Sequence, residues 1–144
     1  MPNNIAKPEK CSICGCQFKS GKYAADNPAG RAHHSKHHYI AERFFGRTKN
    51  KRKHPRTKIF VTSPWEGVEG ETTLLCYDCH EELLHNPVLL PKDIESLNML
   101  VACEGLAEIN KTNKEKIAGR IKLFHKVIRA GLKCLLKEQN IDNC

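Results

Sequence analysis

The spacing of apolar residues is most regular in the last third of the chain. From about residue 113 to residue 139, apolar side chains recur every three or four positions, which is the spacing of one face of an α-helix. They are Ile117, Ile121, Phe124, Ile128, Leu132 and Leu135. Residues 93–108 follow similar spacing at positions 94, 97, 100, 101 and 103. We therefore expect two C-terminal helices, the longer one with a continuous apolar stripe.

The first two thirds of the chain contain shorter apolar runs. Residues 59–62 are rich in β-favouring side chains and residues 72–75 form a second such run, so we expect two short strands. Residues 37–45 are compatible with either a strand or a helical turn. The pattern as a whole predicts an α+β fold, in which short strands and helices are followed by a C-terminal helical region.

Two further short elements are predicted from local sequence. A helix is expected at 79–85, where Asp78 as N-cap and Glu81 three positions later have the spacing of a capping box. A tight hairpin turn is expected at 11–18, where Gly15 can adopt a positive φ.

The composition indicates one domain, or one domain with an appendage, because the chain has 144 residues. No apolar run is as long as a membrane span, and the polar first ten residues lack the apolar core of a signal peptide. We therefore expect a cytoplasmic protein with reduced thiols and no membrane partner. In that setting, eight cysteines favour metal binding over disulfides.

Four of the cysteines form two widely separated pairs, each with two residues between its members. They are Cys11 with Cys14 and Cys76 with Cys79. Four thiolates are a closed ligand set for structural Zn²⁺, and two such pairs can turn onto a single ion. Cys16 is close enough in sequence to remain a further candidate ligand, whereas Cys103 and Cys134 are expected to be small apolar residues of helix cores.

Basic residues are concentrated in two stretches of a chain whose formal net charge is +8. The first stretch contains eight basic residues and no acidic one: Arg43, Arg47, Lys49, Lys51, Arg52, Lys53, Arg56 and Lys58. A cluster of this kind favours nucleic acid, since each phosphate that it neutralises releases counterions. The alternative is a solvated basic loop. The second stretch, residues 109–137, fits a nucleic-acid contact and a solvated helix face equally well.

Several histidines lie between and beside the cysteine pairs. His37 and His38 are adjacent, so a strand would point their rings to opposite faces. His85 follows His80 by five positions, which is a rotation of about 140° in an α-helix, so these two are not expected to share a face. Glu81 would share a face with His85. The sequence leaves the ligand of a second metal open between His80, Glu81 and His85.

These cysteine and histidine motifs, taken in order, resemble those of the HNH endonucleases. The matching segments are Cys11-Ser-Ile-Cys14, His37-His38-Tyr39-Ile40 and Leu75-Cys76-Tyr-Asp-Cys79-His80. The resemblance covers roughly residues 11–91. It implies a small zinc-stapled ββα-metal domain, in which a hairpin carries the paired histidines and a helix carries the last ligand. We accordingly divide the chain into a nuclease domain, residues 1–91, and a C-terminal helical region, residues 92–144.

The resemblance also implies site roles. His38 would be the general base, and His37 with His80 or His85 would hold one catalytic divalent ion, which could be Mg²⁺, Mn²⁺, Ni²⁺ or Zn²⁺. The basic residues of 43–58 would hold the backbone of double-stranded DNA. The chain departs from the family pattern in three ways. It has no asparagine shortly before Cys76, its last two histidines stand five apart instead of four, and the segment from His38 to Cys76 is long.

Some alternatives stay open at this point. His33 and His34 form another adjacent pair, but we prefer His37-His38 because Tyr39-Ile40 follows it and because Ser35-Lys36 does not suit a strand entering a core. The leading functional prediction is a metal-dependent DNA endonuclease. A zinc-dependent nucleic-acid-binding protein without catalysis is the second reading, and a partner-binding zinc module that uses the C-terminal helices is the third.

Overall fold

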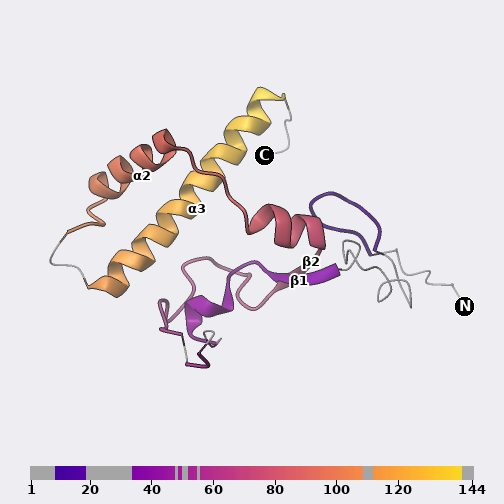
Figure 1. Ribbon diagram of the computed structural model, residues 1–144, viewed down its shortest axis with the longest axis horizontal. Helices are drawn as coiled ribbons and strands as arrows, with labels where there is room; N and C mark the ends of the chain where they lie inside the picture. Colours follow the sequence, from indigo (N-terminus) through magenta and orange to yellow (C-terminus); the bar gives the residue numbers. More distant parts are fainter. Residues whose placement is uncertain are drawn as a thin grey trace, which may run out of the picture. The chain divides into compact units, whose positions relative to one another are not determined.

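The computed structural model describes residues 9–18, 34–47, 49, 52–54, 56–108 and 112–140, and for His34 and Asn113 the backbone alone. These residues form a mixed α/β structure with the order β1, η1, β2, η2, α2 and α3 (Figure 1). The chain divides into two compact units. Unit 1 runs to Arg56 and continues through Thr62–Val88, and unit 2 consists of Thr57–Val61 and the chain from Leu89 onward.

Unit 1 is built on a two-stranded antiparallel sheet of β1 (His34–His38) and β2 (Thr72–Cys76). The expected strand at 72–75 is confirmed and extends by one residue. The expectation that Ser35-Lys36 would not suit a strand is wrong, because both residues lie within β1. A two-stranded sheet leaves part of its surface in water, so polar side chains such as Lys36, which is exposed, are tolerated there.

The first cysteine pair lies in a tight turn next to this sheet. The backbone N–H of Gly15 donates to the carbonyl of Cys11 (2.9 Å), and Gly15 has φ +74°. An isolated bridge between Lys10 and Gln17 closes the turn, which confirms the predicted hairpin. The N–H of Ser12 donates to the carbonyl of Leu74 in β2 (3.1 Å), so the turn is hydrogen-bonded to the sheet near the second cysteine pair.

The chain turns helical soon after β1. A single 3₁₀ turn, η1 (Glu42–Phe45), ends at Gly46 with φ +70°. Residues 37–45 therefore combine both expected forms, since His37 and His38 end β1 and the helical turn begins at Glu42. Ile40, which precedes the turn, and Phe45, the last residue of the turn, are both buried.

The predicted strand at 59–62 does not form. Residues 59–62 have β-favouring side chains, but none of the described residues pairs with them as a neighbouring strand. A strand is stabilised by hydrogen bonds and side-chain contacts to a paired strand, so propensity alone is not enough. Phe60 is buried, whereas Val61 is 73% exposed. Residues 59–61 belong to unit 2, and Phe60 is their buried apolar side chain.

The helix after β2 is a π-helix, η2 (Asp78–Leu84), whose hydrogen bonds join residues five apart. Its N-cap is Tyr77 and there is no side-chain cap, so the predicted capping box of Asp78 and Glu81 is wrong. The physical reason is that the helix begins one residue earlier than the pattern suggests, and the Glu81 carboxylate contacts histidines instead.

Unit 2 contains the two expected C-terminal helices, α2 (Pro91–Cys103) and α3 (Asn113–Glu138). A capping box between Thr112 and Glu115 begins α3, while α2 ends earlier than predicted, shortly before Gly105 with φ +64°. Leu106 and Leu123 are buried. Much of the apolar stripe of α3 is exposed, and Cys103 and Cys134 are exposed too, so the prediction that they are core residues is wrong.

Candidate metal centre and histidine groove

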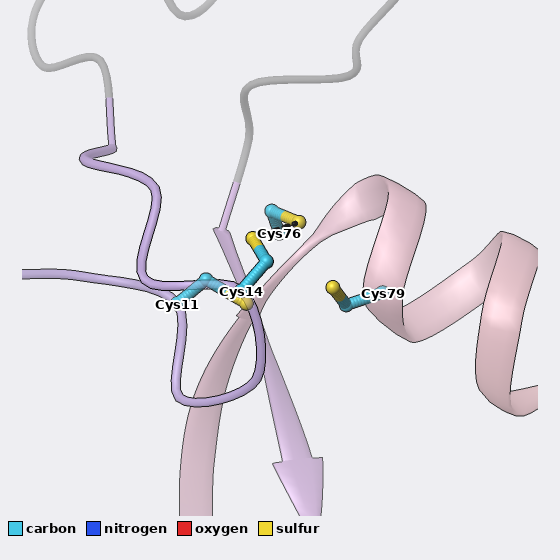
Figure 2. A group of neighbouring side chains, drawn as sticks. All are labelled: Cys11, Cys14, Cys76 and Cys79. Carbon is cyan, nitrogen blue, oxygen red and sulfur yellow. Dashed lines mark hydrogen bonds between the residues drawn. The ribbon is translucent and has the colours of Figure 1, made fainter. Parts of the chain in front are cut away.

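Four cysteine thiols from three separate segments meet at one end of the sheet. Figure 2 shows the side chains of Cys11, Cys14, Cys76 and Cys79 converging from the first turn, the end of β2 and the start of η2. Their sulfur atoms all lie within 4.8 Å of one another. Zn–S bonds of about 2.3 Å at tetrahedral angles place sulfurs about 3.8 Å apart. The Cys14 and Cys76 sulfurs are separated by 3.8 Å, so the cluster is close enough to bind a metal ion and fits a structural Zn²⁺.

The surroundings of the cluster differ from thiol to thiol. Burial raises the pKa of Cys11, but backbone hydrogen bonds from Cys14, Cys76 and Ile13 outweigh it and lower the pKa to about 6. Burial raises the pKa of Cys79, and the neighbouring thiols raise it further. A bound cation would let all four sulfurs be thiolates together, which is the state that zinc coordination requires.

Cys16 is not a member of the four-sulfur group. Its hydrogen bond to the Cys14 sulfur raises the pKa of Cys16 to about 12, with a further contribution from burial. It therefore stays protonated and acts as a donor toward Cys14. Within the described part of the chain, the two predicted pairs are the group whose possible ligand atoms all lie within 4.8 Å of one another.

The sheet connects the cysteine cluster to the histidines. In the antiparallel register, His34 faces Cys76, His37 faces Thr73 and His38 faces Thr72. The threonines stand where the resemblance leads one to expect an asparagine, and the Thr73 hydroxyl is bonded to the Ser12 hydroxyl. The same five-residue ladder thus ends at the zinc-type cluster on one side and at His37-His38 on the other.

Three histidine rings come together beside η2. The ring of His37 lies edge-on to that of His80, with centroids 5.2 Å apart, and the rings of His80 and His85 are 5.0 Å apart. His80 is 15% exposed and His85 is 53% exposed. Because all four cysteine sulfurs are mutually within 4.8 Å and the three imidazoles are not grouped so closely, the histidines form the looser of the two assemblies.

The prediction that His80 and His85 lie on different helical faces is wrong. That prediction assumes an α-helix, in which five residues give a rotation of about 140°. In the π-helix η2, the backbone joins residues five apart, so a five-residue interval returns close to the same face. This geometry brings the two rings into contact despite their unusual spacing.

Polar side chains contact the rings of His80, in η2, and of His85, the C-cap of η2. Glu81 places one carboxylate oxygen 3.2 Å from Nδ1 of His80 and the other 3.1 Å from Nδ1 of His85. The hydroxyl of Ser35, from β1, lies 2.7 Å from the same Nδ1 of His80. His38 has a separate contact, since its Nε2 lies 3.3 Å from a carboxylate oxygen of Glu42.

All four histidines line one groove of about 860 Å³, whose walls also carry basic side chains. The basic residues of this wall are Lys36, Arg43, Lys49 and Arg56. Of the predicted nucleic-acid contacts, Arg43, Lys49 and Arg56 therefore lie beside the histidines. Arg47 does not line the groove and instead pairs with Glu69 (2.8 Å).

The other predicted contacts lie elsewhere. Arg52, Lys53 and Lys58 are absent from the walls of this groove, and Lys51 falls outside the described residues. In the alternative histidine pair, His33 also falls outside them, and for His34 the backbone alone is described. The sequence did not single out Lys36, Ser35 or Glu42, because a lone polar residue has no spacing signal. Their positions beside the histidines result from the register of β1 and from the turn of η1.

Burial and neighbouring positive charge act together on His37. Burial lowers the pKa of His37 below its ordinary value of 6.5, and the charges of His80, His85 and His38 lower it further. A neutral imidazole is the form that binds a metal ion, so the groove favours His37 in its ligand form.

Within the described residues, no helix combines the length and apolarity that a bilayer crossing demands. Comparison with models of known protein families, with characterised proteins and with solved structures gives no match to the chain.

Proposed function

We propose that this protein is a metal-dependent DNA endonuclease of the HNH type, acting in the cytoplasm with a structural Zn²⁺ at the four cysteines. The observation that carries the proposal is the convergence of His37, His38, His80 and His85 in one groove with four basic side chains. A groove lined by imidazoles and cations suits a phosphodiester, which needs both a proton acceptor and charge neutralisation.

The site residues divide by their position. His37, His80 and His85 would hold one divalent ion, since the ring of His80 lies against each of the other two and imidazole nitrogen is a good donor for Ni²⁺ and Zn²⁺. When bound, such an ion polarises a phosphate and stabilises a leaving oxygen. His38 would accept the proton of the attacking water, with Glu42 orienting its ring through Nε2.

The basic wall of the groove would position the DNA. Arg43 and Arg56 cannot lose their charge at neutral pH, so they suit phosphate contacts that are independent of base sequence. Lys36 and Lys49 add two more cations to the same wall. The expected substrate is double-stranded DNA, held by its backbone while one phosphodiester lies over the histidines.

Cleavage of supercoiled plasmid tests this proposal directly. We expect nicking in the presence of Ni²⁺, Mn²⁺, Mg²⁺ or Zn²⁺, with a rate that falls about 100-fold or more in His38→Ala, because general-base catalysis is worth about that much. His54→Ala is the matched control, since His54 is exposed and does not line the groove. Equal rates in His38→Ala and the wild type would rule out the assigned base.

A second function is favoured by the threonines that face His37 and His38 where the family has an asparagine. In this alternative, the protein binds nucleic acid through its zinc-braced basic groove and does not cleave it. Binding that weakens steeply with salt, together with intact plasmid under every metal, would support this reading. Absence of both binding and cleavage would leave the partner-binding zinc module.

A further inference from the structure

The Glu81 carboxylate lies between two imidazoles that follow one another on the same side of η2. Its Oε1 lies 3.2 Å from Nδ1 of His80 and its Oε2 lies 3.1 Å from Nδ1 of His85. In each ring the contact is made by Nδ1, and each contact uses a different oxygen of the carboxylate. The π-helix is what permits this bridge, because it places rings five residues apart on one side with the carboxylate beside them.

These contacts determine which nitrogen of each ring carries the proton. An ionised carboxylate can only accept hydrogen bonds, so a favourable contact requires a proton on the nitrogen that faces it. At His80, the Ser35 hydroxyl also lies 2.7 Å from Nδ1, and it can donate or accept, so the carboxylate is the neighbour that requires an Nδ1–H. The carboxylate contacts therefore favour the Nδ1–H tautomer of both rings, which leaves Nε2 unprotonated as the remaining donor atom.

We propose that Glu81 is the positioning residue of the histidine cluster, which fixes the tautomers of His80 and His85 so that their Nε2 atoms are the ligands of a divalent cation. Ser35 assists at His80 from the neighbouring strand. A carboxylate that accepts the second N–H of a ligand histidine orients the ring and strengthens it as a ligand. The inference rests on the metal site of the proposed function, but it does not depend on DNA cleavage.

The assignment also separates Glu81 from the ligands themselves. Sequence spacing leaves Glu81 open as a ligand, whereas both of its oxygens face ring Nδ1 atoms in the structure. Its carboxylate lies next to two of the three imidazoles and, when ionised, would offset part of the charge of a bound cation.

The tautomers can be measured by long-range ¹H–¹⁵N NMR on protein that carries zinc at the cysteines and no other divalent ion. We expect Nδ1–H signals for His80 and His85 in the wild type. In Glu81→Gln, the amide can offer one oxygen and one NH₂, so at least one of the two rings should change to the Nε2–H form. Glu82→Gln is the matched control, because Glu82 is exposed on the same helix and should leave both rings unchanged.

Binding of Ni²⁺ alone, followed by calorimetry on the same zinc-loaded protein, gives the second readout. Glu81→Gln should weaken Ni²⁺ binding about 10- to 100-fold, Glu82→Gln should stay within about twofold of the wild type, and His80→Ala should abolish the binding. Unchanged zinc content and circular dichroism would show that the variants fold.

The outcomes distinguish this inference from the proposed function. Loss of Ni²⁺ binding in Glu81→Gln with both tautomers unchanged would make Glu81 a ligand and overturn the inference, as would wild-type affinity in that variant or no binding in the wild type. Glu81-dependent Ni²⁺ binding without DNA cleavage would support the inference and refute the nuclease. Cleavage that is insensitive to Glu81 would do the reverse.

Discussion

At the scale of single residues, the sequence identifies the groups with chemical spacing and misses those that act through position. The two cysteine pairs are visible because a two-residue interval is characteristic of zinc ligands, and their sulfurs do meet. Glu42 and Ser35 have no such interval and look like ordinary surface residues. Their contacts with His38 and His80 depend on which residues a turn or a strand register places opposite them, and that is a property of the folded chain.

The environment of His37 leads to a pH-dependence that can be measured residue by residue. Burial and then the charges of nearby histidines depress its pKa, so the folded state binds a proton less readily than the unfolded state does. The contribution of neutral His37 to the stability of the folded state is therefore complete above pH 6.5, the ordinary pKa of histidine. It is lost as the pH falls through the lower pKa that His37 has in the folded state. NMR titration of the zinc-loaded protein should give a midpoint below 6.5 for His37.

A matched variant checks the sign of this effect. Between pH 7.5 and pH 5.5, the unfolding free energy of the wild type should fall by more than that of His37→Asn. The reason is that asparagine does not titrate, so its protonation cannot favour the unfolded state. A His37 midpoint at or above its ordinary value would contradict the expectation.

At the scale of elements, the predictions that succeed rest on local pattern. Helix α3 follows from a long apolar periodicity, and β2 follows from a short apolar run. The strand expected at 59–62 does not form, since none of the described residues pairs with it as a strand, and β1 begins earlier than expected because its pairing with β2 outweighs the polarity of Ser35-Lys36. The π-helical form of η2 leaves no trace in the apolar pattern, so the contact between its histidines could not be foreseen.

Two glycines of α3 provide a paired test of helix packing. Gly131 has open space where a Cβ would stand, so Gly131→Ala should raise the unfolding free energy by about 0.5–1 kcal/mol through helix propensity. At Gly119, a Cβ would overlap the side chain of Leu106, which is buried. Gly119→Ala should therefore lower the unfolding free energy, by about 1 kcal/mol, because overcrowding a packed contact costs more than propensity returns.

Urea unfolding followed by helical circular dichroism measures both variants. As a control, Leu106→Ala should make room for the new methyl group, so that adding Gly119→Ala to it becomes stabilising. Equal gains from the two glycine substitutions in the otherwise wild-type chain would show that Leu106 does not crowd Gly119.

At the scale of the whole molecule, the chain consists of two compact units with different means of stabilisation. Unit 2 consists mainly of helices, with Leu106 and Leu123 among its buried side chains. Unit 1 has a short sheet and a small buried cluster in which three of the four members, Cys11, Cys76 and Cys79, belong to the candidate metal site. Since so small a core supplies little stability alone, unit 1 should depend on its metal.

Zinc removal should therefore disorder unit 1. We expect the purified protein to hold about one tightly bound zinc per chain, and Cys76→Ser to lose it together with the β1–β2 ladder. NMR of His37 and His80 should then show loss of their mutual ring contact, while Cys134→Ser, on an exposed thiol of α3, should keep the zinc. Full zinc content in Cys76→Ser, or an unchanged ladder after chelation, would contradict this dependence.

The π-helix η2 also affects how sites of this kind should be recognised. A motif that requires its last two histidines to stand four residues apart would reject this chain, although its two rings meet. One additional residue in a helix does not separate two side chains if the helix absorbs it as a wider turn. The contact between two such rings depends on the direction in which the side chains point, so a change of one residue in their spacing is compatible with the same contact when the helix is π.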